Sequence, residues 1–257
     1  MARIVAFIVA AFLGVIAALV GFAPATLADW GLRQQTGGRL GLAETGGTVW
    51  DGNGRLVLID ISDRSADRRT IAGVAIPGRI SWDIRMLPLL LGIVNADIRI
   101  DSMGEPVRLS GGLNEMRISA GKLSLPSVDL SRLGSPWNTI KPAGALALEW
   151  DGITLQRGAF NGRASIELRE MASALTPVRP LGSYRIGVLG QGSSAKLDIT
   201  TISGPLLLEG DGTWNSRQGV RFSALASAEE RERTRLQTLL GLIGRRQGTK
   251  TLIKIGA

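Results

Sequence analysis

The sequence predicts a mainly β protein: a single N-terminal transmembrane helix, then a large, curved antiparallel β-sheet or sandwich-like domain with one C-terminal amphipathic helix. Three observations lead to this fold class. The chain begins with an uninterrupted apolar run, alternating apolar and polar residues recur through most of the remaining sequence, and apolar residues near the C-terminus follow a helical spacing.

The apolar run covers residues 4–23, which read IVAFIVAAFLGVIAALVGFA and include no charged side chain. A helix of this length spans the roughly 30 Å hydrocarbon core of a bilayer. The alternative is a cleavable signal peptide, but its apolar core is usually about 7–15 residues long and ends at a small-x-small cleavage site. Thr26-Leu27-Ala28 fits such a site poorly, so we expect a retained anchor.

The charges beside the anchor predict its orientation. Arg3 and the N-terminal amine favour a cytoplasmic N-terminus, because positive charge tends to remain on the cytoplasmic side of a membrane. Residues 1–3 would then form a cytoplasmic stub, residues 4–23 the transmembrane anchor and residues 24–257 a periplasmic β-rich domain. The sequence therefore predicts a single-pass membrane protein whose bulk is exported into the bacterial periplasm or an equivalent space.

The composition restricts the chemistry that is open to this domain. Cysteine is absent, which excludes disulfides, and histidine is absent, which removes the commonest general base and transition-metal ligand. The net charge is +8, an excess that could serve anionic lipid or an acidic partner. The cations are scattered and aromatic residues make up only 5% of the chain, so we expect no nucleic-acid partner, no cofactor and no metal.

Period-two alternation of apolar and polar residues dominates the chain after the anchor. Alternate side chains of a strand point to opposite faces, so each alternating segment presents one apolar and one polar face. Glycine, proline and asparagine between the segments supply turns. We expect one large antiparallel sheet with an apolar side, and its clearest strands are residues 55–61, 79–85, 95–101, 115–119, 144–150, 163–169, 184–188 and 196–200.

Two segments depart from this alternation. Residues 84–94 include an apolar stretch broken by Pro88, which predicts a strand end that runs into a short helical turn and fills the edge of the core. Near the C-terminus, residues 227–230 (Ser-Ala-Glu-Glu) have the form of a capping box, and apolar residues then recur at helical spacing. We expect an amphipathic helix over residues 228–244, followed by a short strand over residues 249–255. The apolar stripe of this helix is Leu236, Leu239, Leu240 and Ile243.

Tryptophans contribute to the motifs that indicate a family. Five of the six are followed by Asp or Asn, residues that favour turns, so we expect indoles at the points where the chain leaves a strand. Together with the apolar anchor, three blocks in order resemble the type II secretion system protein N family: residues 46–52 (GGTVWDG), 204–214 (GPLLLEGDGTW) and 239–244 (LLGLIG). The motif residues are Gly47, Thr48, Trp50, Gly52, Gly204, Pro205, Gly210, Gly212, Trp214, Leu240 and Gly244.

The resemblance implies a non-catalytic component of the general secretory pathway. It implies an inner-membrane anchor, a periplasmic β-rich domain and other secretion-system subunits as partners, and it supplies no catalytic residues. The residues themselves point the same way. Two Ser-x-x-Lys tetrapeptides, at residues 119–122 and 193–196, lack the Ser-Asp-Asn and Lys-Thr-Gly elements that accompany this spacing in penicillin-binding enzymes.

Two functional classes remain open at this stage. In the first, the chain is an assembly subunit whose exposed strand edges bind partner domains by β-augmentation. In the second, it is an anchored periplasmic lipid-binding or lipid-transport module, whose apolar sheet face holds acyl chains. The difference depends on whether the C-terminal helix closes the apolar face. We favour a closed core, because such helical stripes usually pack against the protein's own core.

Overall fold

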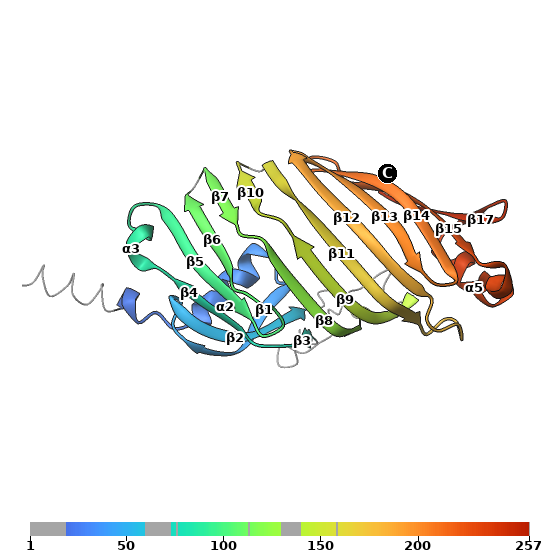
Figure 1. The fold of residues 1–257 in the computed structure, drawn as a ribbon. Helices are drawn as coiled ribbons and strands as arrows, with labels where there is room; N and C mark the ends of the chain where they lie inside the picture. The colour runs from blue at the N-terminus through green and yellow to red at the C-terminus, as the bar shows by residue number, and fades with distance from the viewer. Residues whose placement is uncertain are drawn as a thin grey trace, which may run out of the picture. The chain divides into compact units, whose positions relative to one another are not determined.

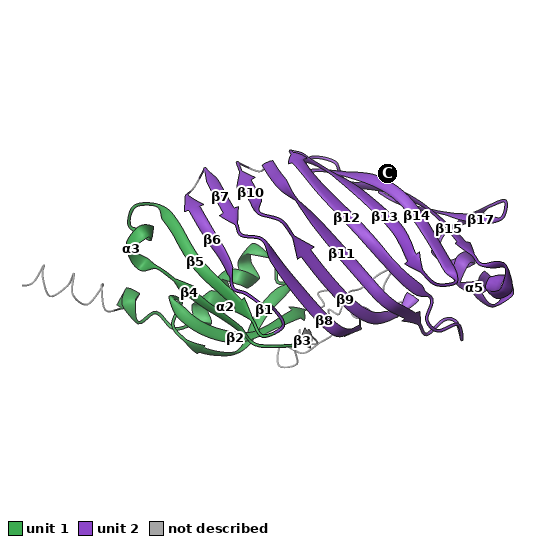
Figure 2. Cartoon of the chain, viewed as in Figure 1, with its two compact units in different colours: residues 1–101 green, residues 102–257 purple. Residues whose placement is uncertain are grey.

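The computed structural model describes residues 19–59, 73–75, 77–112, 114–129, 140–157 and 159–256. The chain divides into two compact units, Met1–Asp101 and Ser102–Ala257 (Figure 2). Among the described residues, no helix is both long enough and apolar enough to span a bilayer. Residues 4–18 of the expected anchor lie outside the described residues.

Unit 1 joins a short antiparallel sheet to one amphipathic helix. Its elements are α2 (Thr26–Gln35), β1 (Leu40–Gly47), β2 (Asp51–Ile59), β3 (Gly73–Ala75), β4 (Ile80–Ile84), α3 (Met86–Leu89) and β5 (Ile93–Ile100). Strand β2 pairs with β1, β3 and β4, and β4 pairs with β5. The Asp29 carboxylate fixes α2 to the sheet, since it accepts hydrogen bonds from the Leu42 N–H (2.6 Å) and the Arg33 Nε (2.9 Å).

Unit 2 is a long antiparallel meander. Its elements are β6 (Val107–Gly112), β7 (Glu115–Ile118), β8 (Gly121–Asp129), β9 (Pro142–Trp150), β10 (Ile153–Gln156), β11 (Ala159–Ser173), β12 (Gly182–Gly192), β13 (Ser194–Ser203), β14 (Leu206–Asn215), β15 (Gly219–Ala228), η2 (Glu230–Glu232), α5 (Arg233–Ile243), β16 (Arg245–Gln247) and β17 (Lys250–Ile255). Strands β11 to β15 follow one another in the sheet, and β17 pairs with β15 (Figure 1).

The described strands confirm the mainly β prediction. Each of the eight alternating segments contains a strand: β2, β4, β5, β7, β9, β11, β12 and β13. The described strands of unit 2 belong to one open sheet, so its architecture is not a sandwich. Strands β7 and β8 run in line with each other. Strand β7 pairs with β10 and strand β8 pairs with β9, so the two short strands together act as one long strand of the sheet.

The C-terminal helix is confirmed, but it is shorter than expected. Helix α5 begins at Arg233, and no side chain caps its N-terminus. The capping-box interpretation is wrong, because Ser227 and Ala228 pair with β14 as the last residues of β15. Their ladder hydrogen bonds satisfy the backbone groups that a helix start would leave unpaired. After the helix, Arg245 and Arg246 lie in β16, which pairs with the predicted final strand, β17.

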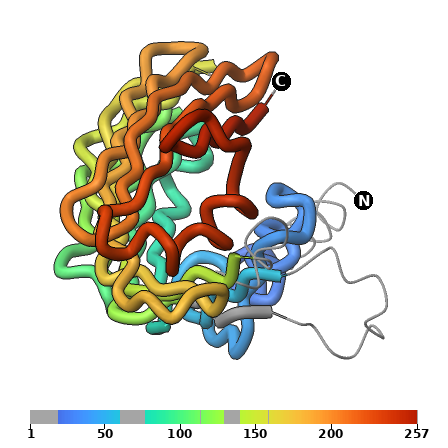
Figure 3. The backbone as a smooth tube through the Cα atoms, turned by 90° about the vertical axis from the view of Figure 1, so that its right-hand side faces the viewer, coloured from blue at the N-terminus to red at the C-terminus, as the bar shows by residue number. Residues whose placement is uncertain are grey.

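The apolar stripe of α5 packs as expected against the sheet of its own unit. Leu236 and Leu239 are buried, at 0% and 1% exposure, and they contact a cluster that includes Tyr184 and Leu206. Leu240 and Ile243 lie partly buried against the same cluster. Figure 3 shows this C-terminal segment on the inner side of the curved unit 2 sheet.

The apolar segment between β4 and β5 forms the expected helical turn, α3, but it does not fill the core. Leu87, Leu90 and Leu91 are 77%, 83% and 79% exposed. The β4–β5 ladder ends at the Ile84–Ala96 pair, so the long connection between these residues extends beyond the paired strands.

Candidate functional site

The register of unit 2 brings apolar residues from many strands into rows on one face. Residues that pair across neighbouring strands lie directly opposite one another on the same face. One row runs through Leu123, Leu148, Ile166, Ile186 and Ile199, on β8, β9, β11, β12 and β13. We call this set the apolar row. All five side chains keep intermediate exposure.

Two further rows flank the apolar row on the same face. The first consists of Leu125, Leu146, Leu168, Tyr184 and Thr201. The second consists of Gly121, Trp150, Ala164, Val188, Leu197, Gly212, Phe222 and Ile255. The expected sheet with one apolar side therefore exists in unit 2, and it extends across eight strands.

Helix α5 covers only part of this face. The cluster beneath it includes Tyr184, Leu168 and Ile199, near the end of the strands where Leu206 lies. Leu148, Ile166 and Ile186 of the apolar row do not belong to that cluster. The face is thus closed at one end by the chain's own helix, and a stretch of half-exposed apolar side chains continues beyond it.

Tyr184 is the buried polar anchor of the covered end. It is the single tyrosine of the chain, 4% exposed, and its hydroxyl donates a hydrogen bond to the Leu206 carbonyl O at 3.0 Å. Burial raises the pKa of the Tyr184 hydroxyl above its ordinary value. The alternation of residues 184–188 predicted the strand, but it did not indicate this cross-strand hydrogen-bond partner.

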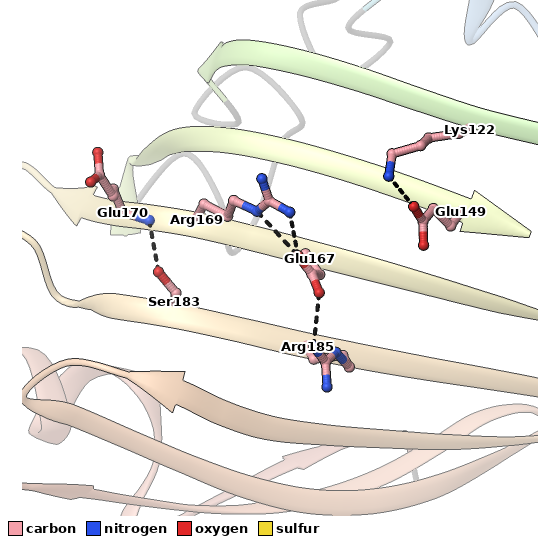
Figure 4. Close-up of polar contacts among 7 residues, drawn as sticks. All are labelled: Lys122, Glu149, Glu167, Arg169, Glu170, Ser183 and Arg185. Carbon is pink, nitrogen blue, oxygen red and sulfur yellow. Dashed lines mark hydrogen bonds and ion pairs between the residues drawn. The ribbon is translucent and has the colours of Figure 1, made fainter. Parts of the chain in front are cut away.

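The opposite face of the same strands carries paired charges. The Glu167 carboxylate accepts hydrogen bonds from Arg169 (2.7 Å) and from Arg185 (2.9 Å) (Figure 4). Lys122 Nζ donates to Glu149 on the neighbouring strand. The hydrogen bonds from Arg169 and Arg185 hold the pKa of Glu167 below its ordinary value, and the Arg169 bond is the larger cause. The cations and Glu149 are more than half exposed, and Glu167 is 23% exposed, so water still screens each pair and each adds little stability.

Two hollows of unit 2 lie on this charged face. One is lined by Lys122, Glu149, Arg163 and Ser165, and another by Glu167, Arg169, Glu170, Ser183 and Arg185. Among the described residues, no group of three or more Asp or Glu side chains is arranged to hold a metal ion. Because Glu149 and Glu167 are held by cations, the face offers paired charges rather than a free acid and base.

The first motif block builds the β1–β2 turn of unit 1. Gly47 has φ +83°, and a Cβ there would lie 2.5 Å from the Asp51 carbonyl O, so the turn requires glycine. Thr48 Oγ1 accepts hydrogen bonds from the N–H groups of Trp50 and Asp51 at 3.2 and 3.0 Å. Trp50 is half-buried, and its Nε1 donates to the Val20 carbonyl O at 2.7 Å. Gly52 lies directly opposite Trp82 of β4.

The second and third blocks lie in unit 2. Gly204 has φ +109° in the turn before β14, where a Cβ would come within 2.3 Å of Gly182 Cα. The Pro205 carbonyl O accepts the Glu229 N–H at 2.8 Å, which ties this turn to the end of β15. Gly210, Gly212 and Trp214 lie within β14, and Gly244 separates α5 from β16. Leu240 packs against the same buried cluster as Leu206 and Leu208 of the second block, at the covered end of the apolar face.

The motif residues therefore fix backbone geometry and packing. The structure joins the second and third blocks around the α5 cluster, while the first block serves a turn of unit 1. The sequence alone did not show the burial of Tyr184, the alignment of the apolar row across strands, or the ion pairs of Glu167, because each depends on strand register. Only the alternation itself signalled them.

Comparison with known families completes the description of the site. The family model of type II secretion system (T2SS) protein N matches residues 38–252, from β1 into β17. The chain belongs to the T2SS protein N family. No curated protein and no solved structure matches the chain. The family resemblance of the three blocks is confirmed, the chain is a T2SS component, and family membership implies that it interacts with other secretion-system subunits.

Proposed function

We propose that this T2SS protein N is a non-catalytic subunit, anchored in the inner membrane, whose periplasmic β units support protein export across the cell envelope. The observation that carries the proposal is the family match over residues 38–252, which follows closely on the apolar run of residues 4–23. A run of this length suits a bilayer-spanning helix.

The chemistry of the charged face supports a non-catalytic role. A general acid near neutral pH needs a raised carboxyl pKa, yet the pKa values of Glu115 and Glu167 are both lowered. Hydrogen bonds from Gln156 and Arg117 are the main causes at Glu115, and hydrogen bonds from Arg169 and Arg185 are the main causes at Glu167. These ionised, paired carboxylates suit a recognition surface better than an active site.

The proposal is tested by the topology of the full chain. A reporter that is active only after export is fused after Ala257, and membranes are washed with alkaline carbonate. We expect an active reporter that stays in the carbonate-resistant membrane fraction. A second reporter that is active only in the cytoplasm serves as the matched control and is expected to be silent. Active reporter in the soluble periplasmic fraction, with a new N-terminus near Asp29, would show a cleaved signal instead of an anchor.

The uncovered part of the apolar row favours a second candidate function, that of an anchored periplasmic lipid-binding module. Ile166 and Ile186 face the same side as the α5 cluster without belonging to it. A continuous row of this kind could hold an acyl chain. Mass spectrometry of lipids that co-purify with the detergent-extracted chain tests the idea. Retained lipid that is lost in Ile166→Asp, but kept in the charged-face variant Glu167→Gln, would support it. Equal lipid content in all three proteins would contradict it.

A further inference from the structure

The tip of the β4–β5 hairpin is the most apolar exposed segment of unit 1 outside the N-terminal run. Beyond the Ile84–Ala96 pair, the Arg85 N–H donates to the Asn95 carbonyl O at 2.9 Å, and the chain then leaves the sheet. Residues 86–95 (MLPLLLGIVN) contain no charged side chain. We call these ten residues the apolar tip.

Three hairpin turns of unit 2 differ from the apolar tip in composition. Residues 192–194 (GSS), 215–219 (NSRQG) and 247–250 (QGTK) connect neighbouring strands of unit 2 with small or polar residues. Such turns can remain in water at no cost. The apolar tip instead exposes three leucines to more than three quarters of their full extent. Contiguous exposed apolar surface of this kind marks a site of contact with an apolar partner.

Hydrogen bonds through Trp50 join the end of the apolar N-terminal run to the last residue of β4, just before the apolar tip. Trp50 Nε1 donates to the Val20 carbonyl O at 2.7 Å, and the Val49 N–H donates to the Ala23 carbonyl O at 2.9 Å. The Trp50 carbonyl O in turn accepts the Ile84 N–H at 2.6 Å, two residues before α3 begins. Trp50 therefore fixes the end of the run and the start of the tip to the same end of the unit 1 sheet.

The last residues of the N-terminal run extend the same kind of surface. Leu19 and Phe22 are 69% and 81% exposed. Arg85 stands where the tip leaves the sheet, with 56% of its side chain exposed, although it also lies 3.6 Å from Asp97. An apolar segment with a cation at its base is the pattern of a protein segment that enters the interface of a bilayer with anionic lipid.

We propose that the apolar tip inserts into the bilayer beside the transmembrane segment, as a second membrane contact of unit 1. The inference rests on the proposed anchoring by residues 4–23. A single spanning helix lets the periplasmic part rotate and tilt freely about one connection. Two contacts at one end of the unit 1 sheet would fix its orientation to the membrane, with Trp50 as the link between them.

The absence of cysteine from the chain makes the test direct. The full chain with Leu90→Cys is labelled with an environment-sensitive NBD dye and reconstituted into vesicles of phosphatidylcholine and phosphatidylglycerol. Some vesicles carry a doxyl quencher on the acyl chains. The matched control is Ser216→Cys, at the polar β14–β15 turn. Flotation of the same samples measures anchoring separately.

We expect at least a twofold loss of NBD emission at position 90 in doxyl vesicles, together with a blue shift, and no change at position 216. Chain that floats while the dye at position 90 responds only to aqueous iodide would overturn the tip contact and leave the anchor intact. Protection from both quenchers would also overturn it, because a second copy of the chain would then cover the tip. Chain that does not float at all would refute both the anchor and the tip contact.

Discussion

The indole of Trp150 covers Gly121 on the neighbouring strand. The two residues pair directly across β9 and β8, and a Cβ at Gly121 would lie 2.3 Å from the Trp150 ring. Trp150 Nε1 also donates to the Ser119 carbonyl O at 2.9 Å, at the break between β7 and β8. The ring thus protects a glycine that would otherwise weaken the strand, and it satisfies a carbonyl that the break leaves without a ladder partner.

The same arrangement recurs in unit 1. Trp82 of β4 lies opposite Gly52 of β2, where a Cβ would come within 2.5 Å of the ring. Trp82 Nε1 donates to the Val49 carbonyl O at 2.9 Å, just before β2 begins. In each unit, therefore, a tryptophan pairs with a glycine on the neighbouring strand, and the indole N–H binds a carbonyl where the backbone is irregular. The expectation that indoles lie where the chain leaves a strand fits Trp150, the last residue of β9, and Trp214, the last but one of β14. It is wrong for Trp82, which lies in the middle of β4 opposite Gly52.

The Trp150–Gly121 pair predicts the effect of adding a single carbon. We expect Gly121→Ala to lower the free energy of unfolding by about 1–3 kcal/mol, because the ring must move or the strand must shift. The matched control is Gly104→Ala, where a Cβ would meet nothing within 4 Å and φ is not positive. Urea unfolding followed by tryptophan fluorescence measures both. Equal stability of the two variants would contradict the close packing.

Replacing two leucines of helix α5 should have very different effects on stability. Leu236 is 0% exposed within the cluster of unit 2, whereas Leu242 is 56% exposed. We expect Leu236→Ala to cost about 2–5 kcal/mol of unfolding free energy through the cavity it leaves. Leu242→Ala should change stability by less than about 0.5 kcal/mol. Circular dichroism during urea titration checks both values. A small effect of Leu236→Ala would mean that α5 is a lid and not part of the core.

Tyr184 predicts a dependence of stability on alkaline pH. Burial raises its pKa above the ordinary value of 10.0, so the folded chain keeps the proton when the unfolded chain loses it. The unfolded state then binds fewer protons above about pH 10, and stability falls as pH rises, by at most about 1.4 kcal/mol per pH unit. Below that pH the contribution is constant. The free energy of unfolding, measured from pH 8 to 11, should fall more steeply in the native chain than in Tyr184→Phe. Parallel curves for the two proteins would contradict the raised pKa.

Trp50 predicts a local effect at the N-terminal end of unit 1. Because Trp50 is half-buried, its loss should not unfold the unit, in contrast to the effect of a fully buried aromatic residue. Trp50→Phe removes the hydrogen bond to Val20 and should cost about 0.5–1.5 kcal/mol. Limited proteolysis should then cut near residues 20–25 faster, with β1 to β5 intact. Trp30→Phe, at a side chain that is 63% exposed, is the control. Identical cleavage of both variants would contradict the link.

The alternation of apolar residues predicted most of the fold, and its limits have a physical cause. It located strands such as those of Ile166 and Ile186, because a half-buried strand repeats every two residues. It could not show that these residues pair in one row, since register depends on turn geometry and on contacts far apart in the chain. The stripe of Leu236 and Leu239 predicted α5, but the preceding residues joined β15, because ladder pairing with β14 replaced the expected cap.

The candidate site was less predictable than the fold. The motif residues Gly47 and Gly204 were found by resemblance, and the structure explains them by positive φ and close backbone contacts. The apolar tip around Leu90 was expected to fill the core, because an apolar sequence alone does not show whether the hairpin turns over the sheet or away from it. Its exposure depends on where the β4–β5 ladder ends.

The central claim is that this T2SS protein N supports secretion from an anchored, periplasmic position. It is tested most directly by secretion itself, in a bacterium whose own copy of the chain has been removed. The measurement is the fraction of a T2SS substrate that reaches the medium when the full chain, or a chain whose residues 4–23 are replaced by a polar linker, is supplied. The account predicts that removal lowers this fraction, that the full chain restores it, and that the linker variant does not. Secretion that is equal in all these strains would contradict the claim.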